Sequence, residues 1–328
     1  MKRIQTPIFF MLLLATTFIQ RTIQFHKMGH MIVARIAELE IENTRIHKQI
    51  LDILSILTQY TKEQDYMFIE AAPWADDIKA VGVKSMSKWH FSDNYINGNR
   101  VLTKKELTEH KITENPENLV WATNQAKTVL RNKHTSLIDD RMNKSIYMRL
   151  LIHFYGDLHQ PLHNVSFVDD KDFKKGDAGG NAFKIDLSGA RDLHTLWDKC
   201  VKKCKEVVLP LSKEDFDLID SYAKDLMKKY PRSQKWVKER LEVVSVKEIS
   251  LESIPMAIDY VYKGIQFNKK PTQSYLEEGG NLIDKQLLIG GYRLSDSLQI
   301  LFEDEEVLKP HLKPKKKQFE NGVQANFV

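Results

Sequence analysis

Two pairs of residues place a histidine and an aspartate four positions apart, His153 with Asp157 and His194 with Asp198. On a helix such positions share one face, so each pair would present an imidazole and a carboxylate to the same neighbour. A single pair of this spacing is more often a surface contact. Here both pairs lie in apolar surroundings, where uncoordinated polar groups are costly to bury. Nitrogen and oxygen donors of these types bind zinc, and the sequence therefore predicts a metal site.

Four more segments carry donors that could join these pairs. His163 follows Gln160-Pro161, where the proline should end a helix and redirect the chain. Trp74-Ala-Asp76-Asp77 and Trp89-His90-Phe91-Ser92-Asp93 each set a donor beside aromatic residues, and Gly29-His30 precedes a helical pattern. Asp76 or Asp77 could equally cap a helix N-terminus. The other histidines lack a second donor at useful spacing, except His159 in the LHQPLH turn, and we interpret them as surface or core residues: His26, His47, His110, His134, His159 and His311.

The elements that must position these donors are mostly helical. Thr103-Lys-Lys-Glu106 is a capping-box pattern that opens one helix. Alternating strand patterns are scarce, and a short hairpin is expected around residues 181–187. The sequence predicts an all-α fold with a single mainly helical domain and at most that hairpin. Apolar residues recur at helical spacing in residues 32–39, 46–57, 138–158, 213–229 and 282–302, the last with a break at Gly290-Gly291.

The two ends of the chain differ from the domain predicted at residues 25–308. Residues 1–24 combine Lys2 and Arg3 with a short apolar stretch, which is typical of a secretory signal peptide and too short for a membrane span. Residues 309–328 mix prolines with lysines and predict a disordered basic tail, or an arm that holds a polyanion. The net charge of +5 divides into +3 for residues 1–24, +4 for the tail and −2 for the domain, so the basic charge belongs to the ends.

Secretion would permit disulfides and N-linked glycans. Cys200 and Cys204 are the two cysteines. On a helix they would be neighbours with poor geometry for a bridge, and free or loosely paired thiols both remain open. Asn143-Lys-Ser145 and Asn164-Val-Ser166 match the acceptor pattern for N-glycosylation. A glycan on Asn164 would have to point away from any site that uses the neighbouring His163.

Taken in order, these segments resemble the zinc-dependent class I nucleases, which are secreted single-strand nucleases and 3′-nucleotidases. That family shares a superfamily with the bacterial zinc phospholipases C. The resemblance spans residues 25–302 and implies the mainly helical fold of that superfamily. The matching motifs are Gly29-His30, Trp74-Ala-Asp76, Trp89-His90-Phe91-x-Asp93, His153-Phe-Tyr-Gly-Asp157-x-His-Gln-Pro-Leu-His163, Gly179-Gly-Asn181, Leu193-His194-x-x-Trp197-Asp198 and Gly291-Tyr-Arg-Leu294.

The resemblance implies three zinc ions per chain, two of them bridged by Asp157. The second ion would also be bound by the amine and carbonyl of the mature N-terminal residue. This residue is a tryptophan in the family and Phe25 here, which can serve through its backbone if cleavage falls after Gln24. Asp77 remains an alternative to Asp76, although the Trp-x-Asp spacing favours Asp76. The implied ligands are Asp76, His90, His153 and Asp157 for the first ion, Asp157, His30 and Phe25 for the second, and His163, His194 and Asp198 for the third.

The resemblance further implies a hydroxide, shared by the two bridged zincs, that attacks phosphorus in line while the third zinc stabilises the departing 3′-oxygen. Lys79 and Asn181 would offset charge on the phosphate, although Lys79 could be an ordinary exposed lysine. A base would stack on Phe91, with Asp93 at the base edge or orienting a zinc-bound histidine. Because stacking needs an unpaired base, the expected substrates are single-stranded DNA and RNA and 3′-nucleotides.

Two other functions remain open. A zinc-dependent phospholipase C would use the same metals with a lipid headgroup in the cleft, and a non-catalytic zinc-binding protein would have lost activity through the change at Phe25. Phe91, Asp93 and Gly179-Gly-Asn181 favour the nuclease. No obligate protein partner or stable membrane span is evident. We expect the protein to be secreted or to reside in a lysosome-like or vacuole-like compartment.

Overall fold

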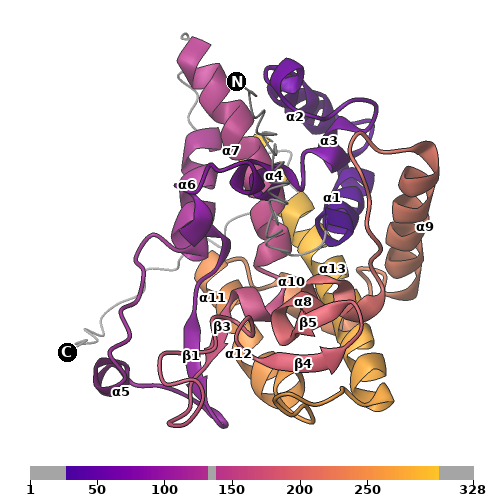
Figure 1. Ribbon diagram of the computed structural model, residues 1–328. Coiled ribbons are helices and arrows are strands. Elements are labelled where there is room, and N and C mark those ends of the chain that lie inside the picture. Colours follow the sequence, from indigo (N-terminus) through magenta and orange to yellow (C-terminus); the bar gives the residue numbers. More distant parts are fainter. Residues whose placement is uncertain (1–26, 132–137, 303–328) are drawn as a thin grey trace, which may run out of the picture.

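Residues 27–131 and 138–302 are described by a computed structural model of the chain. The predicted signal peptide, Phe25 and the basic tail lie outside these residues. The described part consists mainly of helices, with a few short strands gathered in one part of the molecule (Figure 1). The predicted mainly helical fold is confirmed. Among the described residues, no helix is both long and apolar enough to cross a membrane.

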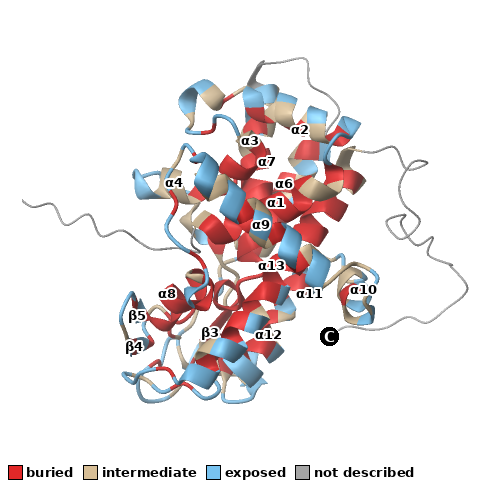
Figure 2. Ribbon diagram, turned by 90° about the vertical axis from the view of Figure 1, so that its right-hand side faces the viewer, coloured by how far each residue is buried: buried red, intermediate tan, exposed pale blue. Residues whose placement is uncertain are grey.

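Helix α1 (Lys27–Ile41) lies within the helical part of the molecule, and most of its residues are buried. Most of its buried residues are apolar, as expected for a helix inside a core, and the buried charged residues Arg35 and Glu38 pair with each other. It packs against α13 (Gln273–Phe302), α9 (Lys213–Lys229) and α7 (Ile138–Asp157). Buried residues gather along these central helices (Figure 2). Core packing thereby brings α1 and α7, which carry predicted donors, side by side.

Helix α13 runs without interruption through Gly290 and Gly291, so the predicted break is wrong. A Cβ atom on Gly291 would lie 2.5 Å from Cβ of Ile36 on α1. A Cβ atom on Gly290 would lie 3.2 Å from Cγ of His159. The two glycines therefore allow close approach of neighbouring segments to α13, and the tertiary packing outweighs their low helix propensity.

Local signals mark the starts of several helices. Helix α9 begins after Ser212, whose side chain accepts a hydrogen bond from the Asp215 N–H, and its range agrees with the predicted 213–229. Helix α5 (Lys104–Glu109) opens with the predicted capping box, in which Thr103 and Glu106 bond each other's backbone N–H. The other helical segments are α2 (Arg45–Ser55), α3 (Met67–Glu70), α4 (Trp74–Ala80), α6 (Leu119–Arg131), α8 (Leu193–Asp198), α10 (Lys235–Leu241), α11 (Val246–Leu251), α12 (Ser253–Met256), the 3-10 turns η1 (Thr58–Tyr60), η2 (Ser87–His90), η3 (Pro161–His163) and η4 (Cys200–Lys202), and the π-helical η5 (Ala257–Val261).

Two small sheets accompany the helices. Strands β4 (Lys184–Leu187) and β5 (Ala190–Asp192) form an antiparallel hairpin close to the predicted one. The second sheet is an addition to the prediction: β1 (Asn94–Asn97) pairs antiparallel with β2 (Arg100–Val101) and parallel with β3 (Val165–Phe167). The strands are too short for an alternating pattern, and β1 and β3 are about 70 residues apart, so local sequence could not reveal them. The parallel pairing sets the segment around Phe91 beside the turn that carries His163.

Cys200 and Cys204 form a disulfide with 5.3 Å between their Cα atoms. The expected poor geometry assumed a helix and is wrong, because α8 ends at Asp198 and Cys200, Val201 and Lys202 have φ angles of 51°, 50° and 74°. This left-handed stretch is unusual for residues other than glycine. The bridge closes a short loop directly after the predicted metal ligand Asp198.

The two glycosylation sequons lie in different environments. Asn143 is exposed on α7. Asn164 is buried, and its Nδ2 donates hydrogen bonds of 3.1–3.2 Å to the backbone oxygens of Asp157, Leu158 and Gln160. Asn164 is therefore not accessible to a glycan in the folded protein, and its side chain instead ties the end of α7 to the turn that follows.

Candidate metal centre

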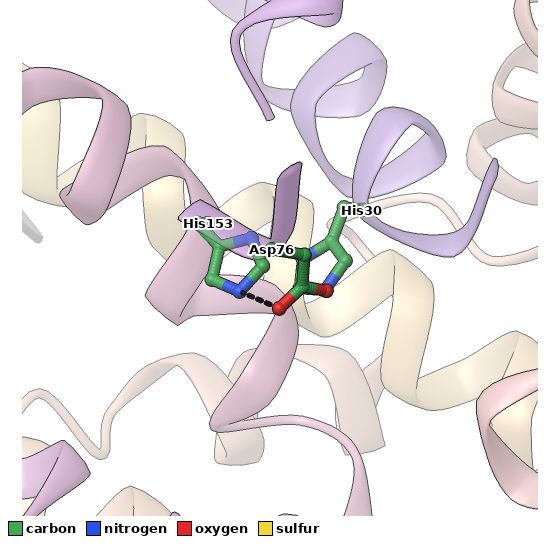
Figure 3. A group of neighbouring side chains, drawn as sticks. All are labelled: His30, Asp76 and His153. Atoms are coloured by element: carbon green, nitrogen blue, oxygen red, sulfur yellow. Dashed lines mark ion pairs between the residues drawn. The ribbon is translucent and has the colours of Figure 1, made fainter. Parts of the chain in front are cut away.

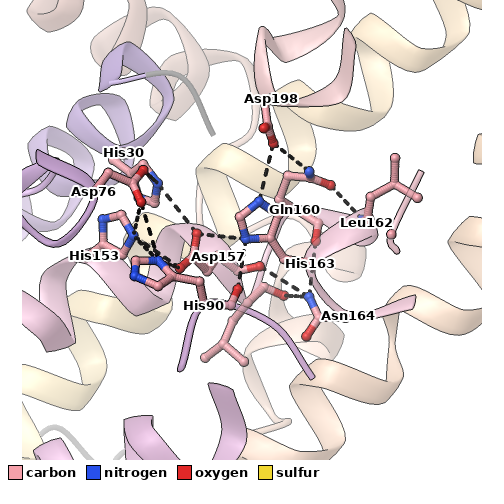
Figure 4. A network of polar contacts seen from close by, with 12 residues as sticks. His30, Asp76, His90, His153, Asp157, Gln160, Leu162, His163, Asn164 and Asp198 are labelled. Atoms are coloured by element: carbon pink, nitrogen blue, oxygen red, sulfur yellow. Dashed lines mark hydrogen bonds and ion pairs between the residues drawn. The ribbon is translucent and has the colours of Figure 1, made fainter. Parts of the chain in front are cut away.

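Six elements bring the predicted donors to one place (Figure 4). Helix α7 presents His153 and Asp157 one turn apart on the same face, as their spacing predicts. Pro161 begins the short turn η3, which places His163 near the end of α7. The remaining donors are His30 from α1, Asp76 from α4, His90 from η2, and His194 and Asp198 from α8.

The first group surrounds Asp157. Its Oδ2 lies 3.1 Å from Nδ1 of His90 and 3.1 Å from Nε2 of His153. Oδ1 of Asp76 lies 3.4 Å from Nδ1 of His90 and 3.6 Å from Nε2 of His153. Two imidazoles and two carboxylates thus face one another, which is a donor set suited to a divalent ion such as zinc.

His30 stands beside this group (Figure 3). Its ring stacks on His153 at 3.9 Å between centroids, and its Nε2 lies 3.5 Å from Oδ1 of Asp157 and 3.9 Å from Oδ2 of Asp76. The donor atoms of His30, Asp76 and His153 lie within 4.8 Å of one another, so they form a group that could hold a metal. His30 therefore contacts both aspartates, whereas the resemblance paired it with Asp157 and Phe25. Phe25 lies outside the described residues.

The third group has the composition that the resemblance implies. Nε2 of His163 lies 3.3 Å from Oδ1 of Asp198, and Nε2 of His194 lies 3.1 Å from Oδ2 of Asp198. Nδ1 of His163 also lies 2.9 Å from Oδ1 of Asp157, so the third group adjoins the first. Helix α8 places His194 and Asp198 on one face, and the turn η3 places His163 beside them. The Asp198 carboxylate is therefore the second one, after Asp157, that lies close to His163.

Backbone carbonyls orient three of the histidine rings. Nδ1 of His153 donates to the Ala72 oxygen at 2.8 Å, Nδ1 of His163 to the His90 oxygen at 2.9 Å, and Nδ1 of His194 to the Gly179 oxygen at 2.6 Å. A carbonyl oxygen only accepts, so Nδ1 of each ring carries the proton. In the neutral ring, Nε2 then offers its lone pair to the centre, as is usual for metal-bound histidines.

The electrostatics of the centre also suit a cation. Burial alone would lower the pKa of His163, but Asp157 and Asp198 outweigh burial and raise this pKa to about 10. Oδ1 of Asp157 and Oδ2 of Asp198 are buried and accept no hydrogen bond of good geometry from the described residues. Their nearest polar neighbours are histidine nitrogens, and buried carboxylates are costly unless they are paired or coordinate a metal. The residues present therefore fit a bound metal.

Neighbouring residues distinguish the alternatives that the sequence left open. Asp77 turns away from the centre, because its carboxylate pairs with Lys27 at 2.7 Å, whereas Asp76 faces the histidines. Gln160 was missed by the sequence analysis. Its Nε2 donates to Oδ1 of Asp198 at 2.7 Å, and its Oε1 accepts from the Leu162 N–H, so it holds Asp198 from outside the donor set. Its position inside the HQPLH motif was the available signal.

A cleft of about 310 Å³ opens above the third group. The predicted substrate residues Phe91, Asp93, Lys79 and Asn181 all line it. Arg191 lines it as well and is a charged residue that the sequence did not single out. The Ser92 N–H donates to the His163 oxygen at 2.8 Å, which fixes the loop between Phe91 and Asp93 next to the donors. The other lining residues are His90, Leu162, His163, Ala178, Gly179 and His194.

Asp93 differs electrostatically from an ordinary surface aspartate. Burial and the nearby Asp177 raise the pKa of Asp93 to about 6, because both disfavour its charged form. Its backbone has a φ of 36°, and the Tyr95 hydroxyl donates to its Oδ2 at 3.5 Å. Asp93 lines the cleft together with Phe91.

Comparisons with known proteins agree with these residues. The sequence model of a family described as S1/P1 nuclease matches residues 25–303. Endonuclease 2 of Arabidopsis thaliana is 24% identical over 283 residues, covering 84% of this chain and 90% of that protein. Endonuclease 4 of the same plant is 24% identical over 309 residues, which cover 89% of this chain and 94% of that protein. Endonuclease 1 is 28% identical over 180 residues, covering 52% and 54%.

These matches confirm the resemblance inferred from the motifs. They support a hydrolase that acts on phosphodiester bonds, and nucleic acid is the substrate class of such enzymes. The metal dependence of this family agrees with the three groups of histidine and aspartate donors. The chain belongs to the S1/P1 nuclease family.

Proposed function

We propose that the protein is a zinc-dependent endonuclease that hydrolyses single-stranded DNA and RNA to 5′-nucleotides and also acts as a 3′-nucleotidase. The observation that carries this proposal is the position of three donor groups next to a cleft that Phe91 also lines. Nitrogen and oxygen donors in buried groups of three or four suit zinc.

The chain's own residues would divide the work as follows. Asp76, His90, His153 and Asp157 would hold one ion, His30, Asp157 and the backbone of Phe25 a second, and His163, His194 and Asp198 a third. Bound zinc would supply an activated water with a pKa of about 7 and offset charge on the phosphate. Lys79 and Asn181 line the cleft and would orient the phosphate.

Phe91 supports the preference for single strands. It lines the cleft and is half-buried, so its side chain is accessible to a base that enters the cleft. A base that stacks on an aromatic ring must leave its own helix, and stacking of this kind tolerates every base. Asp93, which lines the same cleft, would bond the edge of the stacked base.

The experiment that tests the proposal is the substitution His153→Ala. Loss of a residue that hydrogen-bonds a metal ligand costs about 10–100-fold in metal affinity or activity, so loss of the ligand itself should cost more than about 100-fold. Cleavage of single-stranded DNA and RNA and release of phosphate from a 3′-nucleotide would be measured together with zinc content. The control is His47→Ala, because His47 pairs with Glu38 at 3.1 Å and does not belong to the centre.

The wild-type protein should contain three zinc ions and prefer single strands to duplex DNA. Unchanged nuclease activity in His153→Ala would contradict the assignment. Hydrolysis of lecithin without nuclease activity would instead indicate a phospholipase, and zinc content with neither activity would indicate a binding protein.

We also propose that the protein is secreted or enters a lysosome-like or vacuole-like compartment. The disulfide between Cys200 and Cys204 supports this, because disulfides persist in oxidising compartments. Asn143 is the sequon accessible to a glycan. N-terminal sequencing of the exported protein should begin at Phe25, and any other first residue would remove the proposed N-terminal ligand.

A further inference from the structure

Arg191 is a cleft residue to which the proposed chemistry gives no role. It lies on β5, three positions before His194, which belongs to the following helix α8. It lines the cleft together with Asn181 and His194, and its side chain is 58% exposed. A cation at the open side of the cleft can reach a substrate before the buried donors do.

The guanidinium of Arg191 is anchored at one point. Its Nε donates to Oδ2 of Asp192 at 3.0 Å. Asp192 is buried, and its Oδ1 accepts from the backbone N–H of Thr195 at 2.9 Å and so caps helix α8. Among the described residues, the hydrogen bonds of Arg191 use only Nε. Its two terminal nitrogens are therefore available to a ligand, while the bond from Nε to Asp192 holds the guanidinium in place.

The local charge is positive despite this anchor. Lys184 also approaches Asp192, with Nζ at 3.3 Å from Oδ2. One carboxylate thus stands between two cations, so Arg191, Lys184 and Asp192 together carry a charge of +1. An arginine with free terminal nitrogens matches the oxygens of a phosphate in a bidentate manner, which a lysine does not.

We propose that Arg191 binds a backbone phosphate of the oligonucleotide other than the one being cleaved. This rests on the proposed nuclease function. The scissile phosphate must meet the buried donor groups, whereas Arg191 is exposed at the rim of the same cleft. A flanking phosphate is present in DNA and RNA chains and missing from a 3′-nucleotide or a dinucleoside monophosphate. Arg191 therefore makes the enzyme favour chains over single nucleotides.

The test compares Arg191→Ala with wild type on a single-stranded decanucleotide and on a dinucleoside monophosphate. For the decanucleotide, kcat/KM should fall about tenfold through KM, as expected for loss of a charged hydrogen bond. For the dinucleoside monophosphate it should stay unchanged. The slope of log affinity against log salt should become shallower by about 0.7, the value for one phosphate contact on a single strand. Arg191→Lys should keep the salt slope and recover part of KM.

Arg100→Ala is the matched control. Arg100 is an exposed arginine on β2 that pairs with Glu106 and does not line the cleft. Its loss should therefore leave kcat/KM unchanged for both substrates. Zinc content and thermal stability of Arg191→Ala should equal those of wild type, which shows that the Asp192 cap on α8 persists.

Binding of a fluorescent phosphorothioate decanucleotide, followed by anisotropy, separates this proposal from the proposed function. A wild-type protein that binds the chain in an Arg191-dependent manner but cleaves nothing would overturn the nuclease assignment and keep this site. Equal losses on both substrates would place Arg191 at the scissile phosphate and overturn the flanking contact. Unchanged affinity and salt slope in Arg191→Ala would overturn it as well.

Discussion

The pKa of His163, raised to about 10, makes metal binding dependent on pH. Below that pH, the metal-free ring carries a proton that a bound metal must displace, because a coordinating nitrogen needs its lone pair. Zinc affinity of the group formed by His163, His194 and Asp198 should therefore rise with pH, by up to about tenfold per pH unit for one displaced proton. Competition with a chelator between pH 5 and 8 would measure this. A pH-independent affinity would show that His163 is not a ligand.

At this scale the sequence singled out the histidines and aspartates that the structure brings together, but it did not single out the residues that support them. The spacing of His153 and Asp157 was informative because a helix places them on one face, and the structure brings both into the centre. Arg191 could not be found, because its importance depends on the cleft that a folded β5 helps to form. The HQPLH motif drew attention to Gln160, but the bond from Gln160 to Asp198 joins residues 38 positions apart, so the motif could not reveal its partner.

Close helix packing sets the position of His30. A Cβ atom on Gly156, within α7, would lie 2.3 Å from Nδ1 of His30. Gly156→Ala should therefore push His30 away from the aspartates, reduce zinc content and destabilise the fold by about 1–3 kcal/mol. Zinc analysis and thermal unfolding would measure the two effects.

Gly291→Ala is the matched control for this substitution. Its Cβ would lie 2.5 Å from Ile36, which is a comparable overlap between helices at a position that does not contact the predicted donors. It should lower stability while keeping the zinc content of wild type. Equal zinc content in both variants would show that His30 does not depend on the space beside Gly156.

Helix ranges were easier to predict than strands or interruptions. Helix α9 follows from a local amphipathic pattern and a serine cap. The pairing of β1 with β3 depends on the tertiary fold, and so does the continuity of α13 through Gly290 and Gly291. The disulfide was misjudged for the same reason: whether Cys200 and Cys204 lie on a helix depends on where α8 ends.

At the scale of the whole molecule, the domain of residues 25–308 has no positive net charge with which to attract a polyanion. Residues 25–308 carry −2, and the lysine-rich tail lies outside the family match. If zinc supplies the positive charge of the cleft, removing it with a chelator should weaken binding of a phosphorothioate decanucleotide as well as abolish cleavage. Deleting residues 309–328 should leave both unchanged. Undiminished binding after complete zinc removal would show that cationic side chains such as Lys79 and Arg191 bind the decanucleotide without the metal.

The parallel pairing of β1 and β3 fixes the loop that carries Phe91 relative to the turn that carries His163. Hydrogen bonds from Ser92 to His163 and from Asn94 to Asn164, of 2.8 and 2.7 Å, join the loop of Phe91 to the turn that ends at a metal donor. If Phe91 stacks a base as proposed, these bonds hold the stacking residue at a fixed distance from the metal donors. We therefore expect the enzyme to select nucleotides by the distance between their base and their phosphorus atom. Nucleotides with altered sugars should be accepted when they keep this distance, whichever base they carry.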